Sequence, residues 1–524
     1  MRTTSKSFDA GPWPVVGFHD RRVTVARMSQ NKWFRQAVGV AAACAMVASV
    51  VASVSSTGAV VSAAGPVDAG GEFHPLTPAR ILDTRPEEGK YDVAPLGPKP
   101  TGVGNVTTGE WSFDPLGRGG LPQPEDADDV LAIVMTVTVT GPTQPGYLAA
   151  YPTGFDFGGD AISALLTFDA GANVPNLAVL GLGPDGTLTF NANTVAAGSY
   201  HLVVDVFGWI STSTHDSGGG RLELVNPGRI MDTRAVGNGV ESGCNPNPRA
   251  PGQSLAAADS VALQIRGAAA VCPAQPNIVP NDSRVTAVLV NLALVNNNLT
   301  SQPTYVTATP TSVQTNPDKT ANSLAVAGGI HANMAVVPVG NDGKIHLFNN
   351  AGELDLVVDV LGYFIEDVDA EWAATNRGRV VPLDAPFRAF DTRETAFGDA
   401  PLTHGTKESW SFKQFAESVT LNPDDVQPEV GPEQLGLIGG LFAVDLQKTN
   451  RSDGDGVSSY LQMYPGGLTE RPLSANVNFF PREIVPNTSL IKYGTVEADE
   501  YVVDVYNAYG SIDYVLDVYA IVLA

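Results

Sequence analysis

The stretch PARILDTR at Pro78–Arg85 decides the fold, because the chain repeats it twice. It recurs as PGRIMDTR at Pro227–Arg234 and as PFRAFDTR at Pro386–Arg393. The repeats lie 149 and then 159 residues apart. Self-similarity at a nearly fixed period is the signature of tandem duplication. The sequence therefore predicts three copies of one module.

The rest of each copy repeats in the same order. Every copy closes on an apolar strand that carries one aspartate, at Leu202–Trp209, Leu356–Tyr363 and Tyr514–Tyr519. Every copy also holds a Tyr-x4-Pro segment and, further on, an asparagine before an apolar run. The tyrosines are Tyr147, Tyr305 and Tyr460, and the asparagines are Asn176, Asn333 and Asn487. This shared order indicates that the whole module is duplicated.

The pattern within a copy is all-β. Val130–Thr140 and Val285–Val295 are β-branched and roughly alternating, which is typical of strands. Pro184-Asp185-Gly186 between two apolar runs predicts a hairpin turn. Many short strands in modules of about 140–150 residues predict three β-sandwiches. We place them at residues 72–212, 219–366 and 378–524.

The two connections between modules are short and polar, at residues 211–219 and 366–372. Such links favour a linear array of the three modules. A closed ring of three modules is the alternative, although no pattern in the sequence points to it.

The first 63 residues read as a secretory signal peptide with a long basic region. Arginines and lysines precede an apolar run at Ala37–Val54, and small residues follow it. Met28 is a candidate true start. The alternative is a retained anchor, because about 18 apolar residues can span a bilayer. Outside this segment we predict no contact with a membrane, and we expect a secreted location, at or beyond the cell surface.

The charge balance excludes several functions. The 524 residues carry a formal net charge of −24, and seven of the 31 basic residues but only two of the 55 acidic ones lie in residues 1–63. The remainder therefore has a net charge of −29. Nucleic-acid binding is not expected of so acidic a chain, because it needs clustered Lys and Arg to neutralise phosphates.

The repeated motif predicts structural ion pairs rather than catalysis. Alternation in the closing strand places Asp205 on the same face as apolar neighbours, and a buried carboxylate needs a partner. Arg80 is the natural partner, so the first and last strands of a module should lie side by side. The complete predicted set is Arg80, Asp83, Arg85 and Asp205 in copy one, Arg229, Asp232, Arg234 and Asp359 in copy two, and Arg388, Asp391, Arg393 and Asp517 in copy three.

Cys244 and Cys272 are the only cysteines outside the signal segment, and in an exported chain such a pair predicts one disulfide. Asp453 and Asp455 are weak calcium candidates, with an acidic hairpin tip as the alternative. The seven histidines have no metal-ligand spacing, and no nucleophile motif is present. We therefore expect no catalytic residues, cofactor or other metal.

Aromatic residues offer a second interpretation. Those that recur or stand near strands could form a platform on which sugar rings stack, although aromatics in β-sandwiches usually lie in the core. The residues are Tyr147, Tyr305, Tyr460, Trp111, Trp209, Trp410 and Tyr363.

These motifs resemble a repeat module common in secreted and surface proteins of actinobacteria. The resemblance includes GRGGLP at Gly117–Pro122 and GYL at Gly146–Leu148, and it covers nearly the whole chain after the signal. Copy two departs at Gly267–Cys272, where the glycine-rich loop is missing, and copy three lacks the final Gly-Tyr after Val518. The resemblance implies export, but this family has no settled activity to carry over.

The sequence thus predicts a non-catalytic secreted or cell-surface repeat protein that acts in binding, adhesion or envelope structure. Its partner would be an unknown surface ligand, either a glycan or another envelope protein. A carbohydrate-binding protein is the first alternative. An extracellular glycoside hydrolase is the second, and it would need two facing carboxylates about 5–10 Å apart.

Overall fold

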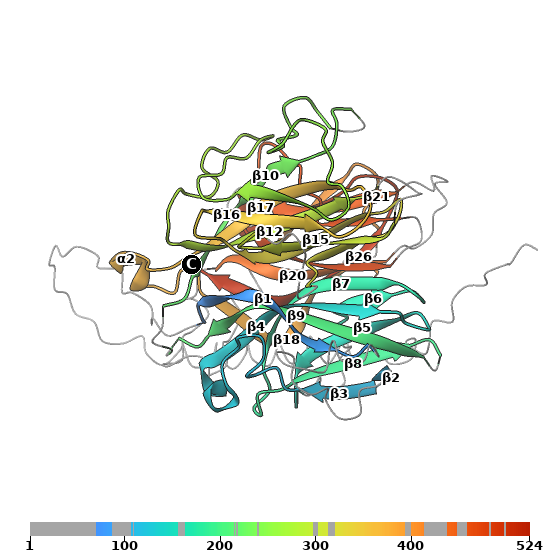
Figure 1. Ribbon diagram of the computed structural model, residues 1–524, viewed down its shortest axis with the longest axis vertical. Coiled ribbons are helices and arrows are strands. Elements are labelled where there is room, and N and C mark those ends of the chain that lie inside the picture. Colours follow the sequence, from blue (N-terminus) through green and yellow to red (C-terminus); the bar gives the residue numbers. More distant parts are fainter. Residues whose placement is uncertain are drawn as a thin grey trace, which may run out of the picture. The chain divides into compact units, whose positions relative to one another are not determined.

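The computed structural model describes residues 70–85, 106–107, 109–155, 163–196, 198–213, 215, 218–237, 240–296, 302–312, 320–393, 400–412, 437–447, 458–480, 484–496 and 499–524. All of them belong to one compact unit (Figure 1). The signal segment at residues 1–63 and the calcium candidates Asp453 and Asp455 lie outside the described residues.

The described residues confirm the all-β prediction and form six antiparallel sheets, two from each copy. In copy one, the sheet that contains the first and last strands has the order β1-β9-β4-β7, and we call it the inner sheet. The other, the outer sheet, has the order β3-β8-β5-β6. The inner strands are β1 (Phe73–Asp83), β4 (Val130–Thr140), β7 (Asn173–Gly181) and β9 (Ser199–Ser211). The outer strands are β3 (Gly109–Phe113), β5 (Gly146–Pro152), β6 (Leu166–Phe168) and β8 (Leu188–Thr194).

Copies two and three repeat this topology strand for strand. The inner sheet of copy two consists of β10 (Arg221–Asp232), β17 (Asp355–Ile365), β12 (Val285–Val295) and β15 (Ile330–Pro338). Its outer sheet consists of β11 (Asp259–Gln264), β16 (Lys344–Asn349), β13 (Thr304–Thr309) and β14 (Ser323–Ala325). The inner sheet of copy three consists of β18 (Val380–Asp391), β26 (Asp513–Leu523), β20 (Leu437–Gln447) and β23 (Val485–Lys492). Its outer sheet consists of β19 (Lys407–Ser411), β25 (Asp499–Asn507), β21 (Ser459–Pro465) and β22 (Val477–Phe479). The remaining elements are β2 (Val106–Thr107), the 3-10 helix η2 (Pro124–Asp129), α2 (Ala370–Ala373) and β24 (Gly494–Val496).

The inner sheets are buried on both faces. All eleven residues of β26 are buried, as are nine of the eleven in β4. One face of the copy-one inner sheet packs with the outer sheet, for example Ile133 with Phe190 in a single apolar cluster. Residues from the inner sheets of the other copies, including Leu361 and Leu441, belong to that same cluster. The cluster therefore joins the three copies.

Each inner sheet contacts the other two, so the copies close into a ring rather than the linear array that the short links favour. The edge strands β7, β15 and β23 contact one another. At one end of the ring the first strands also meet: the backbone of Gly71 bridges to Val380, and Phe73 bridges to Gly220. The physical reason for closure is the second apolar face of each inner sheet, which would face water in an open array.

No helix among the described residues is long and apolar enough to cross a membrane.

Candidate functional site

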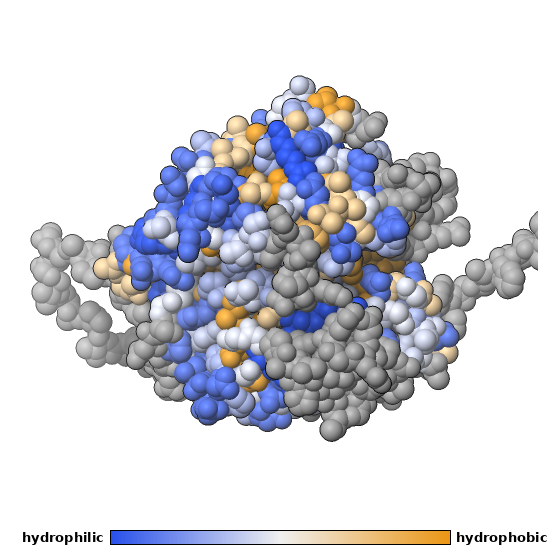
Figure 2. All heavy atoms as spheres, in the orientation of Figure 1, coloured by the Kyte–Doolittle hydropathy of each residue, from blue (hydrophilic) through white to orange (hydrophobic). Residues whose placement is uncertain are grey.

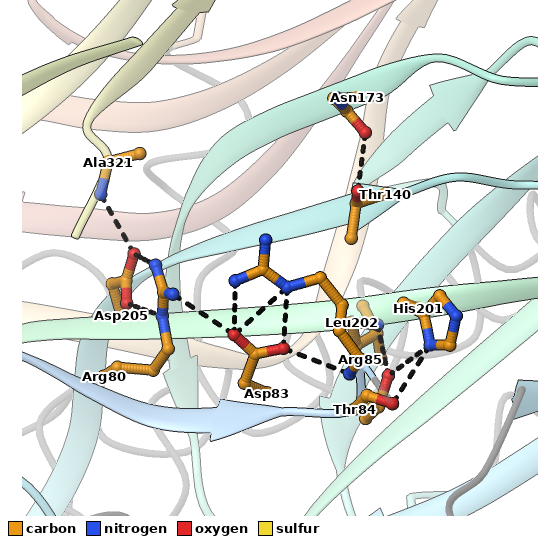
Figure 3. Close-up of polar contacts among 10 residues, drawn as sticks. All are labelled: Arg80, Asp83, Thr84, Arg85, Thr140, Asn173, His201, Leu202, Asp205 and Ala321. Atoms are coloured by element: carbon orange, nitrogen blue, oxygen red, sulfur yellow. Dashed lines mark hydrogen bonds and ion pairs between the residues drawn. The ribbon is translucent and has the colours of Figure 1, made fainter. Parts of the chain in front are cut away.

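The motif arginine of copy one lies between two aspartates (Figure 3). Antiparallel pairing of β1 with β9 sets Arg80 opposite Asp205. Nε of Arg80 donates to Oδ1 of Asp205 at 2.9 Å, and its Nη2 donates to Oδ2 at 3.2 Å. Its Nη1 donates to Oδ2 of Asp83 at 3.2 Å. Nη2 of Arg85 donates to the same oxygen at 2.6 Å. The predicted residues of copy one therefore form one connected network.

Copies two and three build the same network. Nε of Arg229 donates to Asp359 at 2.9 Å, and Nε of Arg388 donates to Asp517 at 2.6 Å. Asp232 and Asp391 each join their motif arginines, Arg229 and Arg234 in copy two and Arg388 and Arg393 in copy three. The copies differ in burial: the arginine side chain is 7% exposed in Arg229 but 34% exposed in Arg388.

Electrostatics support a structural role for these carboxylates. Complete burial raises the pKa of Asp205, and the guanidinium of Arg80 opposes that rise. Burial also acts to raise the pKa of Asp391, but the hydrogen bonds and charge of Arg393, together with the charge of Arg388, outweigh it and lower the pKa. Each carboxylate is enclosed by fixed donors, so none is placed as a general acid or a nucleophile for an outside substrate.

The threonine after each motif aspartate ties the first strand to the last. The hydroxyl of Thr84 accepts the backbone N–H of Leu202 at 2.8 Å. Thr233 and Thr392 accept the corresponding N–H groups of the closing strands, both at 2.9 Å. These hydroxyls satisfy backbone donors.

Each ion pair also contacts the next copy, a feature that the sequence does not predict. The backbone N–H of Ala321 in copy two donates to Oδ2 of Asp205 at 3.0 Å (Figure 3). Nη2 of Arg229 donates to the carbonyl of Leu473 in copy three at 2.8 Å. Oγ of Ser163 in copy one donates to Oδ2 of Asp517 at 2.5 Å, which completes the cycle. Two of these three partners are backbone groups, which leave no mark in a sequence.

The other predicted sites have separate locations. The sulfurs of Cys244 and Cys272 lie at disulfide distance, with 5.6 Å between their Cα atoms. Among the described residues no group of three or more His, Cys, Asp or Glu side chains is placed to hold a metal ion.

The seven predicted aromatics divide into two groups. Tyr147, Tyr305 and Tyr460 occupy equivalent, half-buried positions on the outward faces of the three outer sheets, between inward-facing residues such as Leu148. The others do not join them: Trp111 and Trp410 pack on core phenylalanines, Trp209 is buried against His74, and Tyr363 packs against the core of copy two. The structure therefore places three of the seven aromatics at separate, equivalent positions and does not gather all seven into one platform.

The outer sheet of copy three carries the most polar chemistry. Its register sets Tyr506 between Lys407 and Gln462, and Asp504 between Ser409 and Tyr464. The strand residues that alternate with these six face inward, and they are apolar except for Glu408 and Asn507. Nζ of Lys407 lies 2.5 Å from Asp504. Burial and the nearby Asp504 charge raise the pKa of Tyr464 to about 12, so this hydroxyl stays protonated at neutral pH.

Arg471, from the loop between β21 and β22, lies over this face. Its guanidinium carbon is 4.0 Å from the ring centroid of Tyr506. Its Nη1 donates to Oη of Tyr460 at 3.2 Å and to Oε1 of Gln462 at 2.8 Å. Nε2 of Gln462 is fixed in turn by the carbonyl of Pro472 at 2.5 Å. We call this group, Lys407, Tyr460, Gln462, Tyr464, Arg471, Asp504 and Tyr506, the copy-three face.

Sequence reasoning found Tyr460 in this group but missed Arg471 and Tyr506. The period-2 alternation of Val503, Asp504, Val505 and Tyr506 was the available signal for an outward tyrosine. Arg471 had none, because its place depends on how a loop folds back over the sheet.

No protein-family model matches the chain, and no curated protein matches it. Among solved structures, the chain has a TM-score of 0.16 and 11% identity to a tandem pair of carbohydrate-binding modules from Paenibacillus barcinonensis, over 56% of this chain and 99% of that one. A triple jelly-roll protein of an archaeal virus has a TM-score of 0.14 and 10% identity, over 90% and 98% of the two chains. A Clostridium perfringens fragment with a catalytic domain and two carbohydrate-binding modules has a TM-score of 0.15 and 7% identity, over 80% of this chain and 34% of that one. Similarity at this level carries no argument about function, which has to be drawn from the residues themselves.

Proposed function

We propose that the chain is a non-catalytic binding protein of the cell surface or the extracellular medium. One observation carries the proposal: the outward faces of the outer sheets hold tyrosines at equivalent positions, while the recurring charged residues are committed to the fold. Tyrosine combines a large apolar ring with a polar tip, which suits it to a wet binding surface.

The carboxylates shared by all copies support a non-catalytic role. Asp83, Asp205 and their equivalents are enclosed by arginines within the described part of the chain. A glycoside hydrolase needs a pair of carboxylates free to meet a substrate, so this alternative ranks last.

The architecture suits a rigid scaffold. Each inner sheet shares an apolar cluster with its outer sheet, so we treat each copy as a sandwich-like module of the actinobacterial type that its motifs resemble. Closure of the ring fixes the three outward faces relative to one another. On the face in Figure 2, apolar residues form small separate patches among hydrophilic ones, as is normal for a protein surface.

Binding of the purified chain to a glycan array and to immobilised cell-envelope fractions tests the proposal. Tyr147→Ala, Tyr305→Ala and Tyr460→Ala would be measured one at a time, with Val236→Ser as a control at an exposed loop position. We expect saturable binding that at least one tyrosine variant weakens about tenfold while the control does not. Absence of binding to every glycan and every envelope fraction would overturn the proposal.

A further inference from the structure

The copy-three face differs in charge from the rest of the chain. The chain carries 55 acidic residues against 31 basic ones. On this face Lys407 and Arg471 stand against one carboxylate, that of Asp504. Lys407 already pairs with Asp504. The charge of Arg471 is held by neutral groups, namely the Tyr506 ring, Oη of Tyr460 and Oε1 of Gln462.

Arg471 is both exposed and oriented. The residue belongs to the exposed class, whereas Gln462 beneath it is fully buried. Stacking on Tyr506 and the two bonds from Nη1 fix the plane of the guanidinium. A fixed guanidinium with a solvent-facing edge suits a carboxylate, because its N–H groups match the two carboxylate oxygens.

The same positions in copy one lack this chemistry. In copy one the register puts Glu110, Asn191 and Ala149 where copy three has Lys407, Tyr506 and Gln462. Oε1 of Glu110 accepts hydrogen bonds from the Tyr151 hydroxyl at 2.8 Å and from Asn191 at 3.2 Å. That face therefore presents a carboxylate where copy three presents a cation.

We propose that the copy-three face binds a glycan that carries carboxylate groups, such as a polymer of uronic acids. The inference rests on the proposed binding function and names the class of its ligand. Arg471 takes the sugar carboxylate, and the ring of Tyr460 lies beside it for contact with the sugar ring. Gln462 and Tyr506 are positioning residues that hold the guanidinium.

The test compares a polymer with and without its charge. Polygalacturonate and its methyl-esterified form differ in the carboxylate alone, and polyglutamate supplies the same charge on a peptide. Binding of the purified chain to each is measured by calorimetry at low and at high salt. We expect polygalacturonate or a second uronate polymer, alginate, to bind at least tenfold more tightly than the ester and than polyglutamate, with affinity falling as salt rises.

Variants then locate the site. Arg471→Gln keeps hydrogen-bond donors but removes the charge, and we expect it to lower the affinity for the uronate polymer at least tenfold. Glu470→Gln removes the exposed charge that precedes Arg471 and should raise the affinity. Arg284→Gln is the matched control, because this exposed arginine of copy two already pairs with Asp282 at 2.8 Å; it should change nothing.

Three results would overturn the inference. They are equal binding of the esterified polymer or of polyglutamate, no binding of either uronate polymer, or full binding by Arg471→Gln. If neutral glycans or envelope fractions still bind in a way that Arg471→Gln leaves unchanged, the proposed binding function stands and only the assignment of the ligand falls.

Discussion

The inner and outer sheets of this chain have the same strand architecture but opposite surroundings. Inner strands such as β12 are buried along nearly their whole length, whereas the edge strand β19 of an outer sheet alternates between exposed and half-buried residues. The inner sheets carry the ion pairs and join the copies, and the outer sheets carry the outward-facing, half-buried tyrosines. A duplicated module can thus use one sheet for assembly and leave the other free to vary, as the difference between Glu110 and Lys407 illustrates.

The largest expected effect is the loss of an inner ion pair. Arg229→Ala leaves Asp359 and Asp232 buried with fewer partners, and we expect the free energy of unfolding to fall by about 3–5 kcal/mol. Urea unfolding of the full chain measures this. The matched change at the edge of an outer sheet is Arg249→Ala, which breaks a more exposed pair with Asp259 and should cost less than about 1 kcal/mol. Equal losses would contradict the division between the sheets.

Removal of apolar volume between the copies should have the next largest effect. Leu441 on β20 is 1% exposed and belongs to the cluster that joins all three copies. Leu441→Ala should lower the free energy of unfolding by about 2–5 kcal/mol, because it leaves a cavity. Lys344→Ala on the outer strand β16 is the control and should change stability by less than about 0.5 kcal/mol. A loss below 1 kcal/mol in Leu441→Ala would mean that the copies are held together elsewhere.

The sequence predicts the inner ion pairs but not the ring that encloses them, and the same strands explain both outcomes. The placing of Asp205 opposite Arg80 follows from two facts that a sequence contains, a repeated arginine and alternation within a strand. The ring depends on the other face of those strands. We read Val130–Thr140 as roughly alternating, yet its only polar residues before the last are Thr136 and Thr138, and both are buried.

That nearly continuous apolar run was the missed signal, because strands buried on both faces lack polar alternation. The partners that complete the ring could not be read at all. Ala321 and Leu473 act through backbone groups, and the loop positions that bring them to Asp205 and Arg229 depend on the tertiary structure. The candidate site divides in the same way: outward tyrosines follow from alternation, and the loop residue Arg471 does not.

The contact that closes the ring between the first and last copies should have a smaller effect on stability. Ser163 donates to Asp517 and accepts the hydroxyl of Tyr519 at 2.8 Å. Ser163→Ala should lower the free energy of unfolding by about 1–3 kcal/mol, since it leaves a buried carboxylate and a buried hydroxyl short of a partner. Hydrogen exchange should rise first in β26. Ser254→Ala, which removes an exposed hydroxyl bonded to Glu353, should leave both measurements unchanged.

The smallest expected effect concerns the end of the ring, where the inner strand β1 meets the link to copy two. The ring of His74 stacks on Trp209 at a centroid distance of 4.3 Å and meets His215 edge-on at 5.3 Å. Burial, helped by His215 and opposed by Glu72, lowers the pKa of His74 from 6.5 to about 4. His215 itself lies 3.2 Å from Asp129.

The sign of the pH dependence follows from that lowered pKa. Above pH 6.5 His74 is neutral in the folded and the unfolded chain and contributes no difference. As the pH falls from 6.5 to 4, His74 becomes protonated in the unfolded chain but stays neutral in the folded chain. The free energy of unfolding therefore decreases as the pH falls, and it levels off below pH 4. Because His74 is partly exposed, we expect a loss of only about 1 kcal/mol. His74→Phe keeps the stack on Trp209 and should reduce the loss of stability between pH 6.5 and 4, whereas His404→Gln at an exposed position should not. If His74→Phe leaves the pH dependence of stability unchanged, the folded chain accommodates a protonated His74. The inner strands would then be packed less tightly at this end of the ring than in their centre.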